Sequence, residues 1–118
     1  MTREEFDTFC SSLTATTHVI QWAGASVWKV GGKIFAIAPN VTEGEFQTLS
    51  FKVSDFAFEI LTQQQGIIPA PYLARAKWVQ ISEEDAMNDE DLKSYITEAH
   101  EIIAKKLTKI MQKELGLL

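Results

Sequence analysis

Residues 66–79 read Gly-Ile-Ile-Pro-Ala-Pro-Tyr-Leu-Ala-Arg-Ala-Lys-Trp-Val, an apolar stretch that cannot form one continuous helix. Pro69 and Pro71 fix their own φ angles, lack N–H groups and push the residues before them towards extended geometry. Gly66 favours the left-handed turn that closes a preceding helix. The stretch then leads into a strand at Trp78. A rigid connection of this kind either forms a binding surface or crosses the core, and the sequence leaves both interpretations open.

Strands are predicted on both sides of this connection. The segments 18–22, 26–37 and 48–53 have β-rich composition, and the last alternates apolar and polar residues most clearly. Gly31 and Gly32 divide the second segment into a hairpin with a two-residue turn. With that register we expect Trp28 to lie opposite Phe35, with Val30 and Ile37 on the same face.

Three helices are predicted from apolar spacing and capping residues. Thr2 and Glu5 form a capping box at the start of a short first helix. Ser54 caps a middle helix, whose inner face we assign to Phe56, Ala57, Ile60 and Leu61. The last is one long helix from residue 88 or 89, whose apolar stripe continues to Ile110.

These elements predict a single α+β domain over residues 1–118. Its mostly antiparallel sheet has about five strands, with the N-terminal, middle and long C-terminal helices packed on one face.

The composition restricts where the protein acts. The formal net charge is −5, so contact with nucleic acid requires a local basic patch. Cys10 is the single cysteine, which excludes an internal disulfide and indicates a reducing compartment. The first residues lead into no apolar segment of a signal peptide, and no apolar run reaches the roughly 18 residues of a spanning helix. We therefore expect a cytoplasmic protein with no membrane partner, and we favour a monomer.

Six stretches of the chain resemble the MmcQ/YjbR-like family. They are Met-Thr-Arg-Glu-Glu-Phe (1–6), Trp-Lys-Val-Gly-Gly-Lys-Ile-Phe-Ala (28–36), Leu-Ser-Phe-Lys-Val (49–53), Gly-Ile-Ile-Pro-Ala-Pro-Tyr-Leu-Ala-Arg (66–75), Lys-Trp-Val (77–79) and Lys-Lys-Leu-Thr-Lys (105–109). They occur in the expected order over nearly the whole chain. The sequence departs from the family at residues 18–22, where many members carry a Pro-Phe type pair, and at 110–112, where a more basic run is common.

The resemblance implies a small α+β domain similar to the fold of the bacterial frataxin CyaY. It implies no assigned biochemical role, because the family largely lacks one. DNA binding through paired β wings has been proposed for the family, and some members resemble accessory or resistance proteins.

For DNA, the candidate residues are cations near the predicted hairpin tip, on an outer strand face and beyond the proline connection: Lys29, Lys33, Lys52, Arg75 and Lys77. Lysine and arginine neutralise phosphates, and a narrow hairpin fits a groove. The alternative is that these side chains provide solubility and block edge pairing. Residues 26–81 hold five basic and four acidic side chains, so we expect weak, salt-sensitive binding.

For a small planar ligand, the candidates are the aromatic residues around the proline connection: Trp22, Trp28, Tyr72 and Trp78. Aromatic side chains with a few polar groups often line such pockets, although they also fill cores with one edge in water.

No catalytic motif is present. Cys10 lies on the apolar stripe of the first helix, and we expect an inert thiol. His18 begins a strand, and His100 is expected to be solvated, without the spacing of a helical metal site. The acidic residues of the first helix and of 82–91 are expected to be solvated charges. We therefore expect no enzyme activity, no cofactor and no metal. The sequence favours a binding protein, with DNA as the first partner and a small molecule in an aromatic cleft as the alternative.

Overall fold

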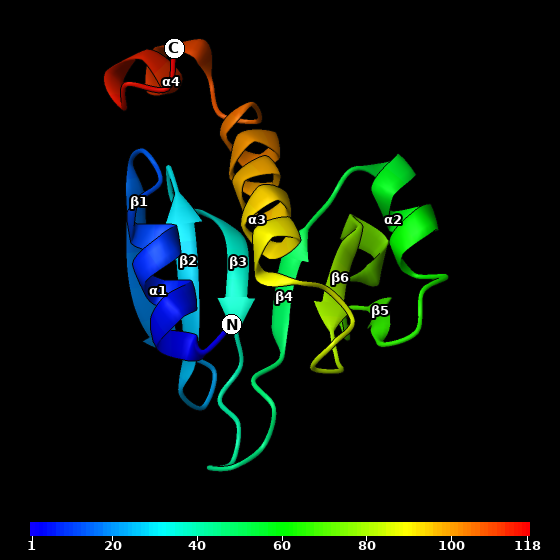
Figure 1. Cartoon of the computed structure of the whole chain (residues 1–118). Coiled ribbons are helices and arrows are strands. Elements are labelled where there is room, and N and C mark those ends of the chain that lie inside the picture. The colour runs from blue at the N-terminus through cyan, green and yellow to red at the C-terminus, as the bar shows by residue number, and fades with distance from the viewer.

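The computed structural model describes all 118 residues and contains a six-stranded antiparallel sheet (Figure 1). Its spatial order is β1-β2-β3-β4-β6-β5. The strands are β1 (Thr16–Gln21), β2 (Ala25–Val30), β3 (Lys33–Ala38), β4 (Leu49–Lys52), β5 (Ile67–Pro69) and β6 (Trp78–Ile81). The α+β class predicted from the sequence is confirmed.

One strand more than expected comes from the proline-rich connection itself. β5 pairs with β6 through Ile67, Ile68 and Pro69, and it forms an edge of the sheet. Proline is tolerated there because an edge strand has one side that needs no hydrogen bond. The two prolines therefore prevent a helix without preventing a short strand.

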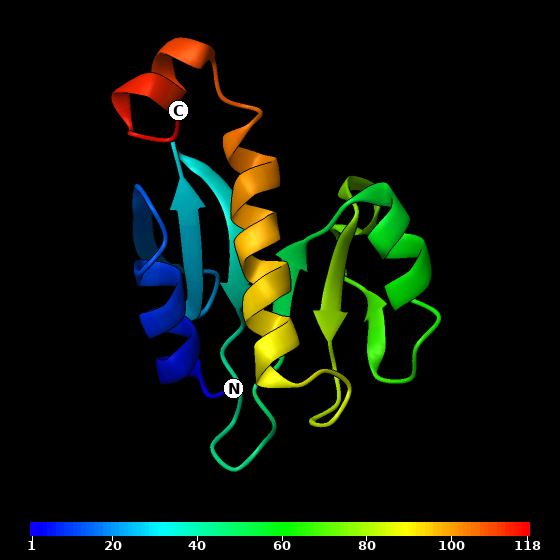
Figure 2. The same ribbon diagram turned by 45° about the horizontal axis from the view of Figure 1, so that its top comes forward.

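The helices are α1 (Arg3–Ser11), α2 (Asp55–Leu61), α3 (Asp89–Ala104) and α4 (Lys109–Glu114), with a 3-10 turn η1 at Ala74–Ala76. Figures 1 and 2 show α1 and α3 on the same side of the sheet. Leu61 of α2 also enters the core that these helices form with the sheet. None of the helices has the length and apolar character needed to cross a bilayer.

The long C-terminal helix starts where the sequence predicts, after its N-cap Asn88, but it is shorter than predicted, because the structure has two helices there. α3 ends at Ala104, and a new helix begins after Thr108, whose side chain accepts a hydrogen bond from the Met111 amide. Between them Leu107 is buried against Gly31 of the β2–β3 turn. The apolar spacing of the sequence continues through this break, so the spacing alone could not reveal where α3 ends.

The predicted pairing of Trp28 with Phe35 is also wrong. Lys33 pairs with Val30 as the two-residue turn requires, but a register shift follows, and Trp28 pairs with Ala36. A bulge of this kind places one extra residue in one strand and changes which side chains share a face. Ile37 therefore lies on the face opposite to Trp28 and Val30.

The inner face of α2 differs from the prediction as well. Phe56 is 76% exposed and Ile60 is 45% exposed, whereas Leu61 is buried with Ala57 and Phe58 packed beside it. The helix has only seven residues, and its apolar residues surround it rather than forming one stripe.

The two faces of the sheet carry separate apolar clusters. The larger one lies under the helices and includes Phe6, Phe35, Phe51 and Ile96. The other face, called the open face below, carries a small cluster of Ala25, Val27, Ile37, Ala70 and Trp78, with Leu73 packed against it. Ala70 and Leu73 belong to the proline connection, so this segment folds back over the open face.

Candidate functional site

The antiparallel topology brings distant cations to one end of the sheet. Lys33 starts β3, Lys52 ends β4, and Lys77 lies directly before β6. Because neighbouring strands run in opposite directions, these three positions share the end of the sheet that also holds the β2–β3 turn. The topology therefore places three of the predicted cations, which come from separate segments, at one end of the sheet.

The C-terminal helices add cations to the same end. Leu107 contacts Gly31, which places the end of α3 beside the β2–β3 turn (Figure 1). Nine of the eleven lysine and arginine residues therefore lie at this end, all except Arg3 and Lys93. We call this set the basic end: Lys29, Lys33, Lys52, Arg75, Lys77, Lys105, Lys106, Lys109 and Lys113.

The opposite end of the molecule is acidic. It holds the first turns of α1 and α3, the β3–β4 loop and the β6–α3 loop (Figure 2). Arg3, Glu43, Glu45 and Glu84 line one shallow depression there. Ten of the sixteen carboxylates are at this end: Glu4, Glu5, Glu43, Glu45, Glu83, Glu84, Asp85, Asp89, Glu90 and Asp91. The net charge of −5 thus conceals a strong separation of charge along the molecule.

The predicted cations differ in how free they are to meet a phosphate. Lys33 and Arg75 are exposed, and Lys29 is half-buried. Lys52 is buried and donates a hydrogen bond to the Ala76 carbonyl. Burial and the neighbouring Lys106 lower the pKa of Lys52.

Lys77 is partly engaged as well, since its ammonium lies 4.8 Å from the centre of the Phe58 ring. Lys105, Lys106 and Lys109 are exposed and were absent from the predicted patch. Lys105 and Lys106 directly follow α3, where cations match the helix dipole, whereas Lys109 begins α4. Only the fold shows that this helix end meets the hairpin.

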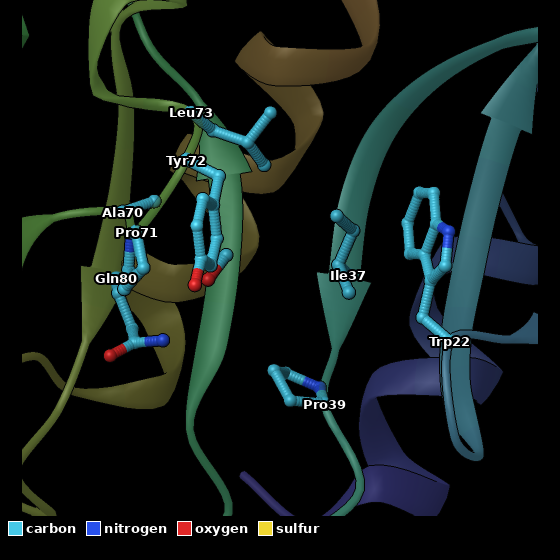
Figure 3. Close-up of a pocket in the computed structure, with 9 residues that line it drawn as sticks. Trp22, Ile37, Pro39, Ala70, Pro71, Tyr72, Leu73 and Gln80 are labelled. Atoms are coloured by element: carbon cyan, nitrogen blue, oxygen red, sulfur yellow. The ribbon is translucent and has the colours of Figure 1, made fainter.

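The open face holds a hollow of about 430 Å³ beside the proline connection. It is lined by Trp22, Ile37, Pro39, Ser50, Ala70, Pro71, Tyr72, Leu73 and Gln80. Figure 3 shows Trp22 and Tyr72 on opposite sides of it, with Ile37 and Pro39 between them. Two of the predicted ligand-binding aromatics are therefore brought together around one concave surface.

The other two predicted aromatics lie elsewhere. Trp28 is buried under the helices, on the face of the sheet opposite to the hollow. Trp78 is buried in the open-face cluster and does not line the hollow. Both indoles are parts of the protein interior, which is the alternative that the sequence left open for them.

Trp22 and Tyr72 share an unusual backbone conformation. Their φ angles are +51° and +67°, in the left-handed region that large side chains rarely adopt. Both side chains are also highly exposed, Trp22 to 60% and Tyr72 fully. Because strained backbone conformations cluster at functional sites, we treat the two rings as candidate ligand contacts.

A polar cluster that the sequence did not predict lies between α1 and the sheet. Asp7 accepts hydrogen bonds from the Ser26 hydroxyl at 2.5 Å and from the Trp28 indole at 2.9 Å. His18 Nε2 lies 2.7 Å from Ser26 Oγ, and its ring stacks on Trp28 with centroids 4.5 Å apart. Since the serine proton points to Asp7, the imidazole must donate to the serine oxygen.

This polarity is the reverse of that in a catalytic triad, where the histidine accepts the serine proton. Ser26 is also completely buried, so its oxygen is not exposed to a substrate. The cluster instead satisfies buried polar groups and joins α1 to β1 and β2.

Two other candidate residues, His100 and Cys10, are buried in the protein interior. His100 is buried, not solvated as predicted, because its Nε2 lies 2.7 Å from the Thr14 carbonyl and Phe35 packs edge-on against its ring. Cys10 is completely buried, and burial raises the pKa of its thiol, as expected for an inert side chain.

Comparison with known proteins gives a family and a fold. A family model described as YjbR matches residues 11–102. A crystal structure of a Deinococcus radiodurans protein with the domain DUF419 is 26% identical with a TM-score of 0.87, over 99% of this chain and 89% of that one. A protein from Pseudomonas syringae shares the fold with a TM-score of 0.70 at 16% identity, over 87% of this chain and 99% of that one. No curated protein matches the chain.

Proposed function

The chain belongs to the YjbR family, and we propose that it is a non-enzymatic cytoplasmic protein that binds DNA through its basic end. The exposed cations of the β2–β3 hairpin, of η1 and of the α3–α4 connection contact phosphates. The feature of DNA that these cations recognise is its regular array of negatively charged phosphates.

The observation that carries the proposal is the gathering of nine of eleven cations at one end of an acidic protein. Solubility requires only scattered charge, whereas a polyanion requires a continuous basic surface. The acidic end repels the same polyanion, so it favours one orientation of the protein on DNA. The β2–β3 turn presents exposed Gly32 and Lys33 at the tip of a two-stranded hairpin, and a two-stranded ribbon fits the major groove of DNA.

A salt titration tests this proposal directly. Fluorescence anisotropy of a labelled duplex is measured at about 50 mM and about 200 mM salt. About four phosphate contacts give roughly a 100-fold loss of affinity over this range. Micromolar binding with such a loss supports the proposal, whereas an absence of binding at the lower salt concentration overturns it.

The second candidate is a small planar molecule in the hollow of the open face, in an accessory or resistance protein. The exposed, strained pair Trp22 and Tyr72 favours it. An apolar hollow binds almost independently of salt, in contrast to the basic end. A metabolite panel screened by thermal shift at about 200 mM salt separates this candidate from DNA binding.

A further inference from the structure

One side of the hollow lies next to the basic end, because Tyr72 lines the hollow and Arg75 follows it three residues later in the same connection. We infer that the hollow binds an unstacked base of a single-stranded nucleic acid whose phosphates lie along the basic end. This inference rests on the proposed function, and it adds that the protein prefers a single strand to a duplex.

The form of the hollow suits a base. Single-stranded nucleic acids are bound by exposed aromatic side chains on which bases stack, next to a positively charged groove. Trp22 and Tyr72 are the exposed aromatic side chains of the open face, and they flank its hollow (Figure 3). Ile37 and Pro39 between them give an apolar floor on which a flat ring fits.

The hollow also has polar groups that can bind the edge of a base. Ser50 and Gln80 line it from neighbouring strands, β4 and β6. The Gln80 side-chain oxygen accepts a hydrogen bond from the Ser82 hydroxyl at 3.2 Å. The Gln80 amide nitrogen is on the side of the hollow in Figure 3. A hydroxyl and an amide suit the edge of a base, which carries both donors and acceptors.

The hollow lies close to the cations of the basic end. Ser50 lies two residues before the end of β4, about 7 Å along the strand from the end of the sheet that carries the cations. Tyr72 precedes Arg75 and Lys77 in the connection that folds back over the same face. A strand with one base beside Tyr72 therefore has its next phosphates at the basic end.

A duplex cannot satisfy both parts of this surface. Its bases are paired and stacked, and swinging one out costs both its base pair and its stacking. A single strand has no such cost, so it gains the stacking contact in addition to the phosphate contacts. The open face thus explains why large aromatic residues remain exposed beside a basic surface.

The test compares three oligonucleotides of about 12 nucleotides, within the site sizes of small single-strand-binding folds. They are oligothymidylate, an abasic strand of the same length and charge, and a duplex. Anisotropy is measured at about 50 mM salt for the wild type, Tyr72→Ala and Tyr72→Phe. Because Tyr72 is fully exposed, neither substitution disturbs the core.

We expect oligothymidylate to bind more tightly than the abasic strand, and Tyr72→Ala to weaken it by about tenfold. Tyr72→Phe keeps the ring and should bind like the wild type, while Tyr72→Ala leaves the abasic strand and the duplex unaffected. Oligothymidylate should also quench the fluorescence of Trp22, the one exposed tryptophan.

Salt-sensitive binding that is equal for oligothymidylate and the abasic strand, and unchanged by Tyr72→Ala, overturns the inference and leaves the proposed function standing. Absence of binding to all three strands overturns both. Quenching by free thymidine without binding of any strand likewise overturns the inference, since it assigns the hollow to a free planar ligand.

Discussion

Tyr72 combines a φ of +67° with a side chain that lies entirely in solvent. In this position the ring contributes nothing to the core, while its β-carbon strains the backbone. The exposed ring is therefore free to contact a partner outside the protein. The sequence identified Tyr72 and Trp22 by their aromatic character, but a sequence does not reveal φ or exposure.

The strain at Tyr72 leads to a stability prediction. Tyr72→Gly should raise the free energy of unfolding by up to about 1 kcal/mol relative to Tyr72→Ala, because glycine adopts positive φ freely. Both variants lack the ring and should lose the same binding to oligothymidylate. Urea unfolding followed by circular dichroism measures the difference. Equal stabilities of the two variants would show that the turn carries no strain.

Residue types alone could not show which of the four predicted aromatics are exposed and which are buried. Trp28 and Trp22 have the same chemistry, yet Trp28 is buried beside Asp7 and Trp22 projects over the opposite face. The hydrogen bond that the Trp28 indole of β2 donates to Asp7 of α1 joins residues 21 positions apart, so it is set by packing and leaves no local signal.

The strands and helix starts were largely predictable, because they depend on local patterns. The capping box of Thr2 and Glu5 forms as predicted, and so do the cap at Ser54 and the two-residue hairpin turn. The bulge after Trp28 and the break after Ala104 were not predictable. Both depend on contacts between elements, in the second case Leu107 against Gly31.

The contact between Leu107 and Gly31 can be tested with two adjacent glycines. Gly31 and Gly32 both have positive φ, at +58° and +81°, but only a β-carbon at Gly31 would overlap Leu107. Gly32→Ala should cost about 1 kcal/mol for its backbone conformation. Gly31→Ala should cost a further 1–3 kcal/mol, roughly, for overpacking.

The control for this comparison is the same pair of glycine substitutions made in a protein that also carries Leu107→Ala. There the excess cost of Gly31→Ala over Gly32→Ala should largely disappear, since the overlapping side chain is gone. Urea unfolding of the four variants measures the coupling. An excess that persists without the leucine side chain would place its origin in the turn, and the docking of the C-terminal helices would need another explanation.

At the scale of the whole molecule, charge separation is the property that the sequence concealed. The cations of the basic end are spread from Lys29 to Lys113, and the net charge is −5. Counting within residues 26–81 gives near balance, with five basic and four acidic side chains. The separation arises only when antiparallel strands and the end of α3 meet at the β2–β3 turn.

The most direct measurement of this account is the salt dependence of DNA binding in two charge-matched variants. One reverses exposed cations of the basic end, Lys33→Glu with Lys106→Glu. The other reverses the two cations outside it, Arg3→Glu with Lys93→Glu, so that both have the same net charge.

The account predicts that the first variant binds more weakly and that the slope of log K against log salt concentration falls by about 2, one unit per lost phosphate contact. It predicts a slope like that of the wild type for the second variant. Equal slopes in the two variants, or binding weakened equally by both, would contradict the assignment of DNA binding to the basic end.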